Sequence, residues 1–221
     1  MENFVEQLVA SEGTVVTETM AFMSYNPSIG RVLEKGGVAK FQCLMRAIVE
    51  KLPSVKSRQD FDALHRESVS NLLANVKTSR DSAPSYGQGQ KPVNVFFKVY
   101  VDWARKPDDQ TRAQLLPYLH VPLDSIVMKT IKRQYPGWYK SAIKPLIKTP
   151  LQEFSLSKID ENLYMKWQAF FREQHPEKPL VFDVVWGLQR RNLSMKMRHP
   201  VFQIRVQLCD SLIFSSSFSE T

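Results

Sequence analysis

Apolar residues recur at steps of three and four along most of this chain, and no other feature of the sequence constrains its fold as strongly. Between residues 58 and 77 they are Phe61, Leu64, Val69, Leu72, Leu73 and Val76. Because an α-helix completes a turn in about 3.6 residues, this spacing places the apolar side chains on one face. Ser57 and Asp60 stand where a capping pair would start the helix. The pattern predicts a mainly α fold, a single-domain helical bundle over residues 1–221.

The same periodicity predicts further helices, which proline or glycine residues separate from one another. Their ranges are 2–10, 14–24, 29–52, 92–105, 125–134 and 157–173, and Gly36-Gly37 makes the third range either one kinked helix or two pieces. Asp124 or Ser125 is expected to cap the helix over 125–134. A segment at about 79–90 that is rich in Ser, Gly and Pro predicts a surface loop within the domain, and residues 215–221 predict a mobile tail.

Only the C-terminal region follows a different period. Phe202, Ile204, Val206 and Leu208 alternate with polar residues, and a period of two is typical of a strand with one buried face. A strand needs a neighbour that satisfies its backbone N–H and C=O groups. We therefore expect a short C-terminal β-strand or hairpin, and pairing of this strand between two chains would give a homodimer.

Composition narrows the class of protein. Hydrophobic residues make up 43% of the chain and charged residues 24%, which is typical of a folded globular protein. The first residues are acidic where a secretory signal would be basic, and no stretch reaches the roughly 20 apolar residues of a membrane span. The sequence thus predicts a cytoplasmic protein that does not enter a membrane. Cys43 and Cys209 are expected to be buried thiols.

Positive charge is concentrated in the second half of the chain. Residues 121–221 contain 15 Lys and Arg and 9 Asp and Glu, and so carry +6 of the net charge of +8. The candidate nucleic-acid-binding residues are Lys129, Lys132, Arg133, Lys140, Lys144, Lys148, Arg190, Arg191, Lys196 and Arg198. Tyr135, Trp138 and Tyr139 lie among them, and such a mixture suits a surface that follows a phosphate backbone and stacks bases. The alternative is a solvated helix followed by core aromatic residues.

Polar side chains also share one face of the helix expected after residue 87. This polar helix face, together with two residues of a following turn, comprises Gln90, Lys91, Asn94, Lys98, His120 and Asp124. One interpretation is a surface that contacts phosphate or nucleic acid. The other is structural: Asn94 and Lys98 would tie the turn at residues 120–124 to the helix, because buried polar groups need partners.

This region resembles a known group of proteins. Residues 87–98 read Gly-Gln-Gly-Gln-Lys-Pro-Val-Asn-Val-Phe-Phe-Lys, and His120-Val121-Pro122-Leu123-Asp124 follows. The order resembles a Gly-x-Ala-Gln-Lys-x-x-Asn-x-x-x-Lys segment followed by His-x-Pro-x-Asp in a family of uncharacterised, predominantly helical bacterial proteins. The resemblance covers about residues 86–127. It implies a helical fold and a bacterial or mobile-element setting, and it implies no particular activity.

Residues with catalytic or metal-binding spacing are scarce. The sequence has no Gly-rich phosphate loop, no Cys-x-x-Cys pair and no His-x-x-x-His pair. The histidines stand on separate segments, so we expect no metal, no cofactor and no catalytic residue. Arg191-Asn192 followed by His199 resembles the motif of the helical HEPN-type ribonucleases. That resemblance supports one further hypothesis, an RNase that uses Arg191 and His199.

Two main hypotheses of function follow. The first is a non-enzymatic, nucleic-acid-associated binding protein whose basic C-terminal half contacts phosphates by charge neutralisation, with some aromatic stacking. The alternative is a helical protein–protein interaction subunit of a larger complex, in which the C-terminal strand offers an edge for pairing. Salt-dependent binding to DNA or RNA would distinguish the first from the second.

Overall fold

The computed structural model describes residues 2–147, 153–185, 187 and 188. The chain divides into two units, Met1–Gly187 and Leu188–Thr221, and nearly all of the second unit lies outside the described residues. The predicted strand over 202–208 and the predicted tail at 215–221 lie there as well. These two predictions, and that of one domain over the whole chain, therefore stay predictions.

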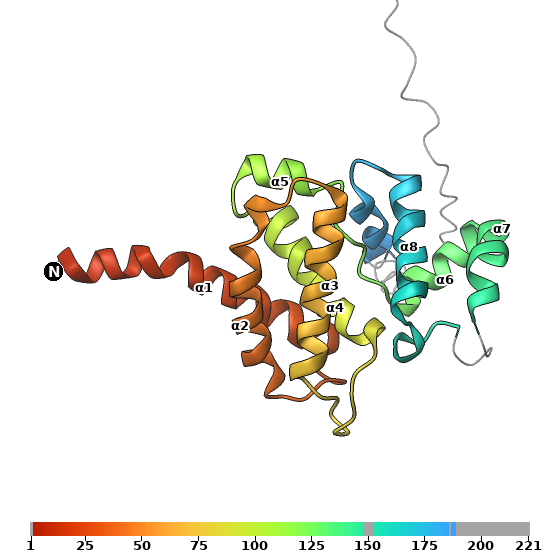
Figure 1. The fold of residues 1–221 in the computed structure, drawn as a ribbon, viewed down its shortest axis with the longest axis horizontal. Coiled ribbons are helices and arrows are strands. Elements are labelled where there is room, and N and C mark those ends of the chain that lie inside the picture. Colours follow the sequence, from red (N-terminus) through yellow and green to blue (C-terminus); the bar gives the residue numbers. More distant parts are fainter. Residues whose placement is uncertain (1, 148–152, 186, 189–221) are drawn as a thin grey trace, which may run out of the picture. The chain divides into compact units, whose positions relative to one another are not determined.

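The described residues are mainly helical, as the sequence predicts (Figure 1). The α-helices are α1 (Glu2–Ile29), α2 (Gly37–Val49), α3 (Arg58–Asn75), α4 (Tyr86–Phe97), α5 (Asp109–Leu115), α6 (Ser125–Gln134), α7 (Pro136–Trp138) and α8 (Glu161–Gln174). Short 3-10 turns are η1 (Leu52–Ser54), η4 (Lys144–Leu146), η6 (Leu156–Lys158) and η7 (Pro179–Asp183), and π-helical turns are η2 (Lys98–Trp103) and η3 (Tyr139–Ile143). Extended pairing among the described residues is limited to one antiparallel bridge, Leu33 with Thr78.

Helix α1 replaces the two short helices predicted over residues 2–10 and 14–24, and that prediction was wrong. Gly13 does not interrupt the helix, since a glycine costs a helix interior only about 1 kcal/mol. Pro27 removes one hydrogen bond of the last turn, and the helix ends two residues later, at Ile29. None of the helices in the described part of the chain has both the length and the hydropathy needed to cross a bilayer.

Helix α3 begins as the sequence predicts. The Ser57 hydroxyl accepts the Asp60 N–H at 3.1 Å, and the Asp60 carboxylate accepts the Ser57 N–H at 2.9 Å. These bonds satisfy N–H groups that the start of a helix leaves without partners. Cys43, expected in the core, is instead exposed on α2. The inward face of α2 carries Phe41, Met45 and Ile48.

Helix α4 begins inside the loop predicted at 79–90, so that loop ends at Ser85. The Ser85 hydroxyl accepts the Gln88 N–H at 3.2 Å, and the Gln88 side chain accepts the Ser85 N–H at 2.8 Å. Gly87 N–H donates to the Ile159 carbonyl at 2.9 Å, and a Cβ at position 87 would lie 2.3 Å from the Leu156 carbonyl oxygen. A close approach to a distant segment therefore requires the glycine that made this stretch look like a loop.

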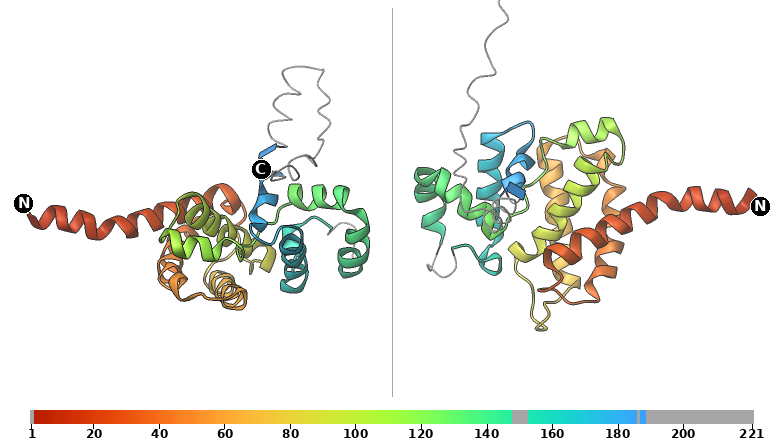
Figure 2. Two further views of the ribbon diagram at one scale, coloured as in Figure 1. Left: turned by 90° about the horizontal axis from the view of Figure 1, so that it is seen from above. Right: turned by 180° about the vertical axis from the view of Figure 1, so that it is seen from behind.

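The helices build two hydrophobic clusters. In the first, α1 packs against α2 and α4, and α3 packs against the same two helices (Figures 1 and 2). Its largest buried side chains include Tyr25, Phe41, Phe61, Phe96 and Phe97. The second cluster draws on α6, η3 and α8 and includes Met128, Tyr139, Tyr164, Trp167 and Phe171. The chain passes from one cluster to the other between Leu119 and Val121.

Candidate functional site

The link between the two clusters is a buried extended segment, Leu119–Leu123. All of its residues are buried, and none belongs to a helix or a strand. A buried backbone outside regular secondary structure must take its hydrogen bonds from side chains. That requirement accounts for the polar residues that surround this segment.

Three buried side-chain amides supply those hydrogen bonds. Gln168 acts as a neighbouring strand would: its Oε1 accepts the Val121 N–H at 2.9 Å, and its Nε2 donates to the Val121 carbonyl at 2.9 Å. Asn94 Nδ2 donates to the same carbonyl at 3.2 Å, and Gln90 Nε2 donates to the Leu123 carbonyl at 3.3 Å. Each of the three amides is at most 1% exposed. The geometry of Gln90 and Asn94 therefore matches the structural interpretation, in which polar side chains of this helix tie it to the turn at residues 120–124.

Asp62 on α3 is shared between His120 and Arg172. One Asp62 oxygen accepts from Arg172 Nη1 at 3.0 Å, and the other accepts from Arg172 Nη2 and from His120 Nε2, the latter at 2.8 Å. Burial alone would raise the pKa of Asp62, but the hydrogen bonds from His120 and Arg172 hold that pKa well below its ordinary value. Asp62 is thus an anion that joins α3 to α8 and to the buried segment.

The positions of the neighbouring protons follow from this arrangement. With His120 Nε2 donating to Asp62, His120 Nδ1 accepts from the Tyr164 hydroxyl at 2.6 Å. His65 Nε2 donates to Asn94 Oδ1 at 2.7 Å, and Asn94 Nδ2 donates to the Tyr164 oxygen at 2.9 Å. Burial lowers the pKa of His120 to about 4 and that of His65 well below its ordinary value. Both imidazoles are therefore neutral at physiological pH.

We call these residues the polar seam, and they are Asp62, His65, Gln90, Asn94, His120, Tyr164, Gln168 and Arg172. An acid, an imidazole and a hydroxyl in a row could in principle move a proton. However, His120 is 2% exposed and Tyr164 is fully buried, so no substrate reaches the hydroxyl. Burial also raises the pKa of Tyr164 well above its ordinary value. The polar seam is a structural centre that fixes one cluster against the other.

The lysines of the polar helix face lie outside the polar seam. Lys91 Nζ lies 3.8 Å from an Asp124 oxygen, and Lys98 Nζ lies 2.5 Å from an Asp183 oxygen. Lys98 therefore does not tie the turn at residues 120–124 to the helix, because one turn beyond Asn94 the neighbouring chain is η7. Asp124 caps α6 as predicted, and its Oδ1 accepts two backbone N–H groups at 2.9 Å each.

A separate basic region lies on α6 and the turns that follow it. Lys129 Nζ and Lys132 Nζ lie 5.8 and 5.4 Å from the centre of the Phe154 ring. Lys132 Nζ also lies 2.8 Å from a Glu153 oxygen. Burial raises the pKa of Glu153, but the hydrogen bonds from Lys132 and Tyr139 and the charge of Lys144 bring it below its ordinary value. Lys132 and Lys144 therefore act on one carboxylate, and Lys129 lies with Lys132 beside the adjacent Phe154 ring.

Arg133 and Lys140 add to this charge. Like Lys144 they are exposed, and within the described residues none of the three forms an ion pair. We call Lys129, Lys132, Arg133, Lys140 and Lys144 the basic surface. The other candidate residues, Lys148, Arg190, Arg191, Lys196 and Arg198, lie outside the described residues, as does His199.

The aromatic residues of this region divide between core and surface. Tyr139 is 2% exposed and donates to Glu153 at 2.6 Å. The Trp138 ring packs against Trp167 and Phe170, with centroid distances of 5.3 and 4.0 Å. Tyr135 is 37% exposed. The interpretation as core aromatic residues therefore describes Tyr139 and Trp138, whereas the ring of Tyr135 is accessible to a partner.

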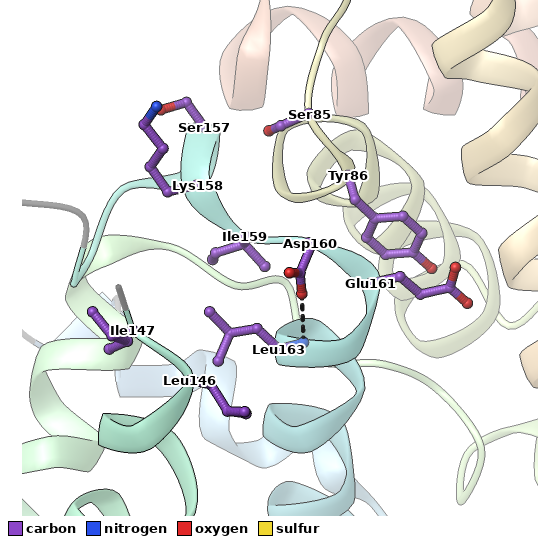
Figure 3. A pocket seen from close by; sticks show the side chains of 10 residues that line it. All are labelled: Ser85, Tyr86, Leu146, Ile147, Ser157, Lys158, Ile159, Asp160, Glu161 and Leu163. Atoms are coloured by element: carbon purple, nitrogen blue, oxygen red, sulfur yellow. Dashed lines mark hydrogen bonds between the residues drawn. The ribbon is translucent and has the colours of Figure 1, made fainter. Parts of the chain in front are cut away.

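A hollow of about 450 Å³ lies beside the start of α4 and the start of α8 (Figure 3). Its apolar lining is Leu146, Ile147, Ile159 and Leu163. Both carboxylates in its described lining are already engaged: Asp160 accepts the Leu163 N–H at 2.8 Å, and Glu161 pairs with Arg66 at 2.5 Å. Contacts within the chain therefore hold both of these carboxylates.

Neither the search for metal-binding groups nor the comparison with known proteins adds a candidate site. Among the described residues, no group of three or more His, Cys, Asp and Glu side chains is placed to hold a metal ion. Comparisons with models of protein families, with curated proteins and with solved structures find no match to this chain. The resemblance of residues 86–127 to helical bacterial proteins therefore stays a prediction.

Sequence reasoning did not single out five of the eight residues of the polar seam, namely Asp62, His65, Tyr164, Gln168 and Arg172. A signal for them exists. Tyr164, Gln168 and Arg172 follow one another at steps of four, which places them in one row along α8. On α3, Asp62 and His65 stand three residues apart beside the apolar face of that helix. Such rows of polar residues at helical spacing, bordering a core face, indicate a buried polar contact between helices.

Proposed function

We propose that this protein binds nucleic acid through the basic surface and does not catalyse a reaction. The observation that carries the proposal is that Lys129 and Lys132 lie over the Phe154 ring, while Lys132 and Lys144 both act on the adjacent Glu153 carboxylate. A cluster of cations that exceeds its local anions attracts a polyanion, and each phosphate that replaces a counterion contributes to affinity.

The chemistry of the basic surface favours sequence-tolerant binding. Four of its five members are lysines, whose ammonium groups act as point charges toward phosphate rather than as paired donors toward base edges. Contacts with the phosphate backbone position a protein on nucleic acid and carry little sequence information. The partly exposed rings of Tyr135 and Phe154 add flat apolar area on which an unpaired base can stack. Single-stranded nucleic acid is thus the favoured form.

Charge reversal on the basic surface tests the proposal. The variant combines Arg133→Glu, Lys140→Glu and Lys144→Glu, all at exposed positions without an ion pair among the described residues. Binding to fluorescent single-stranded and double-stranded oligonucleotides is measured by anisotropy from low to moderate salt. We expect at least a tenfold loss of affinity and a shallower salt dependence, because each lost phosphate contact removes roughly 0.7 to 0.9 from the log–log slope.

A matched control separates a local surface from net charge. Lys35→Glu, Arg58→Glu and Arg80→Glu change the charge by the same amount at exposed positions beside the first cluster. This control should bind nearly as tightly as the unaltered chain. The proposal fails if both triple variants lose affinity equally, or if the unaltered chain does not bind either oligonucleotide at low salt.

One observation favours the second candidate, a protein–protein interaction subunit. Large apolar side chains on the first half of α1 are exposed, including Phe4 at 64% and Leu8 at 55%. Monomeric soluble proteins seldom expose a continuous apolar face of this kind. The two candidates use different residues, so a single protein can have both properties.

A further inference from the structure

The first half of α1 carries an apolar face that its own chain leaves uncovered. Every residue from 4 to 15 is exposed, and in Figures 1 and 2 no other described helix lies along this half of α1. The exposed fractions include 68% for Val9, 57% for Val15 and 50% for Phe22. An isolated helical segment of about a dozen residues is marginally stable in water. A partner that covers this face would stabilise the helix.

The apolar residues of α1 repeat every seven positions. Leu8, Val15 and Phe22 form one series, and Val9, Val16 and Met23 form a second series directly beside it. Because seven residues make almost two helical turns, both series stay on one side of the helix. We call these six residues the apolar stripe. Its length and regularity suit a long contact with a preformed surface rather than a single anchor point.

The charge of α1 restricts what can cover the apolar stripe. Residues 1–30 contain four glutamates and no Lys or Arg, whereas residues 31–221 contain all 30 Lys and Arg with 18 Asp and Glu, a net charge of +12. At about 100° per residue, Glu12 falls within the apolar stripe. Glu6 and Glu12 form no ion pair within the described residues. The apolar face of α1 therefore carries negative charge, whereas the rest of the chain is strongly basic.

Pairing of α1 with a second α1 would bring glutamates together without any compensating cation. Like charges across a helix contact are destabilising. The basic remainder of another copy, residues 31–221, offers the opposite charge. We propose that α1 docks onto the basic remainder of a second copy, with the apolar stripe as the contact face. If the two copies exchange α1 reciprocally, the contact closes into a two-fold dimer.

Sedimentation velocity of the full chain, run from low to high salt, tests this inference. We expect the unaltered chain to be dimeric at micromolar concentration and to dissociate more readily as salt rises. Leu8→Asp with Val15→Asp should weaken the dimer at least tenfold. Ala10→Asp with Thr14→Asp places the same two charges on the opposite side of α1 and should leave the dimer intact. A monomeric unaltered chain, or a dimer insensitive to the first pair, overturns the inference.

Reversing the glutamates identifies which surface receives α1. Glu6→Lys with Glu12→Lys should weaken the dimer at least several-fold, because residues 1–30 then carry no net negative charge to attract the basic remainder. The same change takes residues 1–30 from a net charge of −4 to zero, so a contact between two α1 helices should not weaken, and an unchanged or tighter dimer overturns the inference. A photo-crosslinking residue at position 9 should attach to residues beyond 30 of the other copy. Attachment to the other α1 contradicts the proposal. Since no residue of the basic surface is altered, failure here leaves the nucleic-acid proposal standing.

Discussion

The polar seam and the first half of α1 both depart from the usual placement of side chains. The polar seam places polar groups in the interior, and the first half of α1 places apolar groups on the surface. In the polar seam, an arginine, two imidazoles and three amides are buried between helices, together with a partly buried carboxylate. Along α1, leucine, valine and phenylalanine side chains are half or more exposed. The difference lies in their partners. The carboxylate of Asp62 has hydrogen bonds to both of its oxygens, whereas the apolar stripe has little of its own chain to pack against.

This contrast assigns the two regions to different equilibria. A buried polar group is tolerated when its hydrogen bonds are made, and its removal leaves the partner buried without one. The polar seam therefore bears on the free energy of unfolding. An exposed apolar face adds little to the stability of a monomer, because the unfolded chain exposes the same area. The apolar stripe therefore bears on association.

Removal of the Asp62 carboxylate from the polar seam should have the largest effect on the free energy of unfolding. Asp62→Ala leaves Arg172 as a buried cation without its anion and removes a partner of His120, and we expect a loss of about 3 to 5 kcal/mol in the free energy of unfolding. Urea denaturation followed by circular dichroism measures this loss. Glu67→Ala on the same helix breaks an exposed pair with Lys51 and should cost less than about 1 kcal/mol. Equal losses would mean that the polar seam does not hold the two clusters together.

Lowering the pH should reduce the free energy of unfolding by an intermediate amount, because it favours protonation of His65 and His120. Their pKa values are lowered in the folded chain, to about 4 for His120, below the value of about 6.5 of an unfolded histidine. The unfolded chain therefore binds more protons in this range, so stability is fully present above pH 6.5 and falls as the pH decreases. By pH 5.5 the loss should reach roughly 1 kcal/mol for each histidine.

Urea midpoints at pH 7.5, 6.5 and 5.5 measure this dependence. Below about pH 4, protonation of Asp62 should add to the loss, since its pKa is also lowered on folding. Unchanged stability between pH 7.5 and 5.5 would mean that the buried imidazoles accept protons at no cost. That result would contradict the hydrogen-bond assignment in the polar seam.

The smallest effect on stability is expected at the apolar stripe. Leu8→Asp with Val15→Asp should change the free energy of unfolding of the monomer by less than about 0.5 kcal/mol, because both side chains are more than half exposed. The measurement is made at a concentration below that of dimer dissociation. Phe41→Ala, at a fully buried position, should cost about 3 to 5 kcal/mol as a comparison. A large loss from the α1 variant would show that its first half packs on its own chain.

Local patterns in the sequence predicted those parts of the structure that depend on neighbouring residues. The cap at Ser57 and Asp60 and the cap at Asp124 were predicted correctly, because a capping side chain and the N–H group that it satisfies lie within three residues. The start of α4 was not predicted correctly, because the role of Gly87 depends on contacts with Leu156 and Ile159, which lie far along the chain. Glycine in a segment reads as a loop signal until the distant contact is known.

The sequence by itself determined the helical class of the described residues, most helix positions and the excess of positive charge in the second half. Each of these depends on spacing or composition within one stretch of chain. Only the tertiary structure decided that Gln90 and Asn94 are core residues, that Tyr139 is buried and Trp138 partly buried against the core, and that the residues of the apolar stripe are largely exposed. The physical reason is that periodicity shows which residues share a face. What covers that face depends on segments far along the chain, or on another molecule.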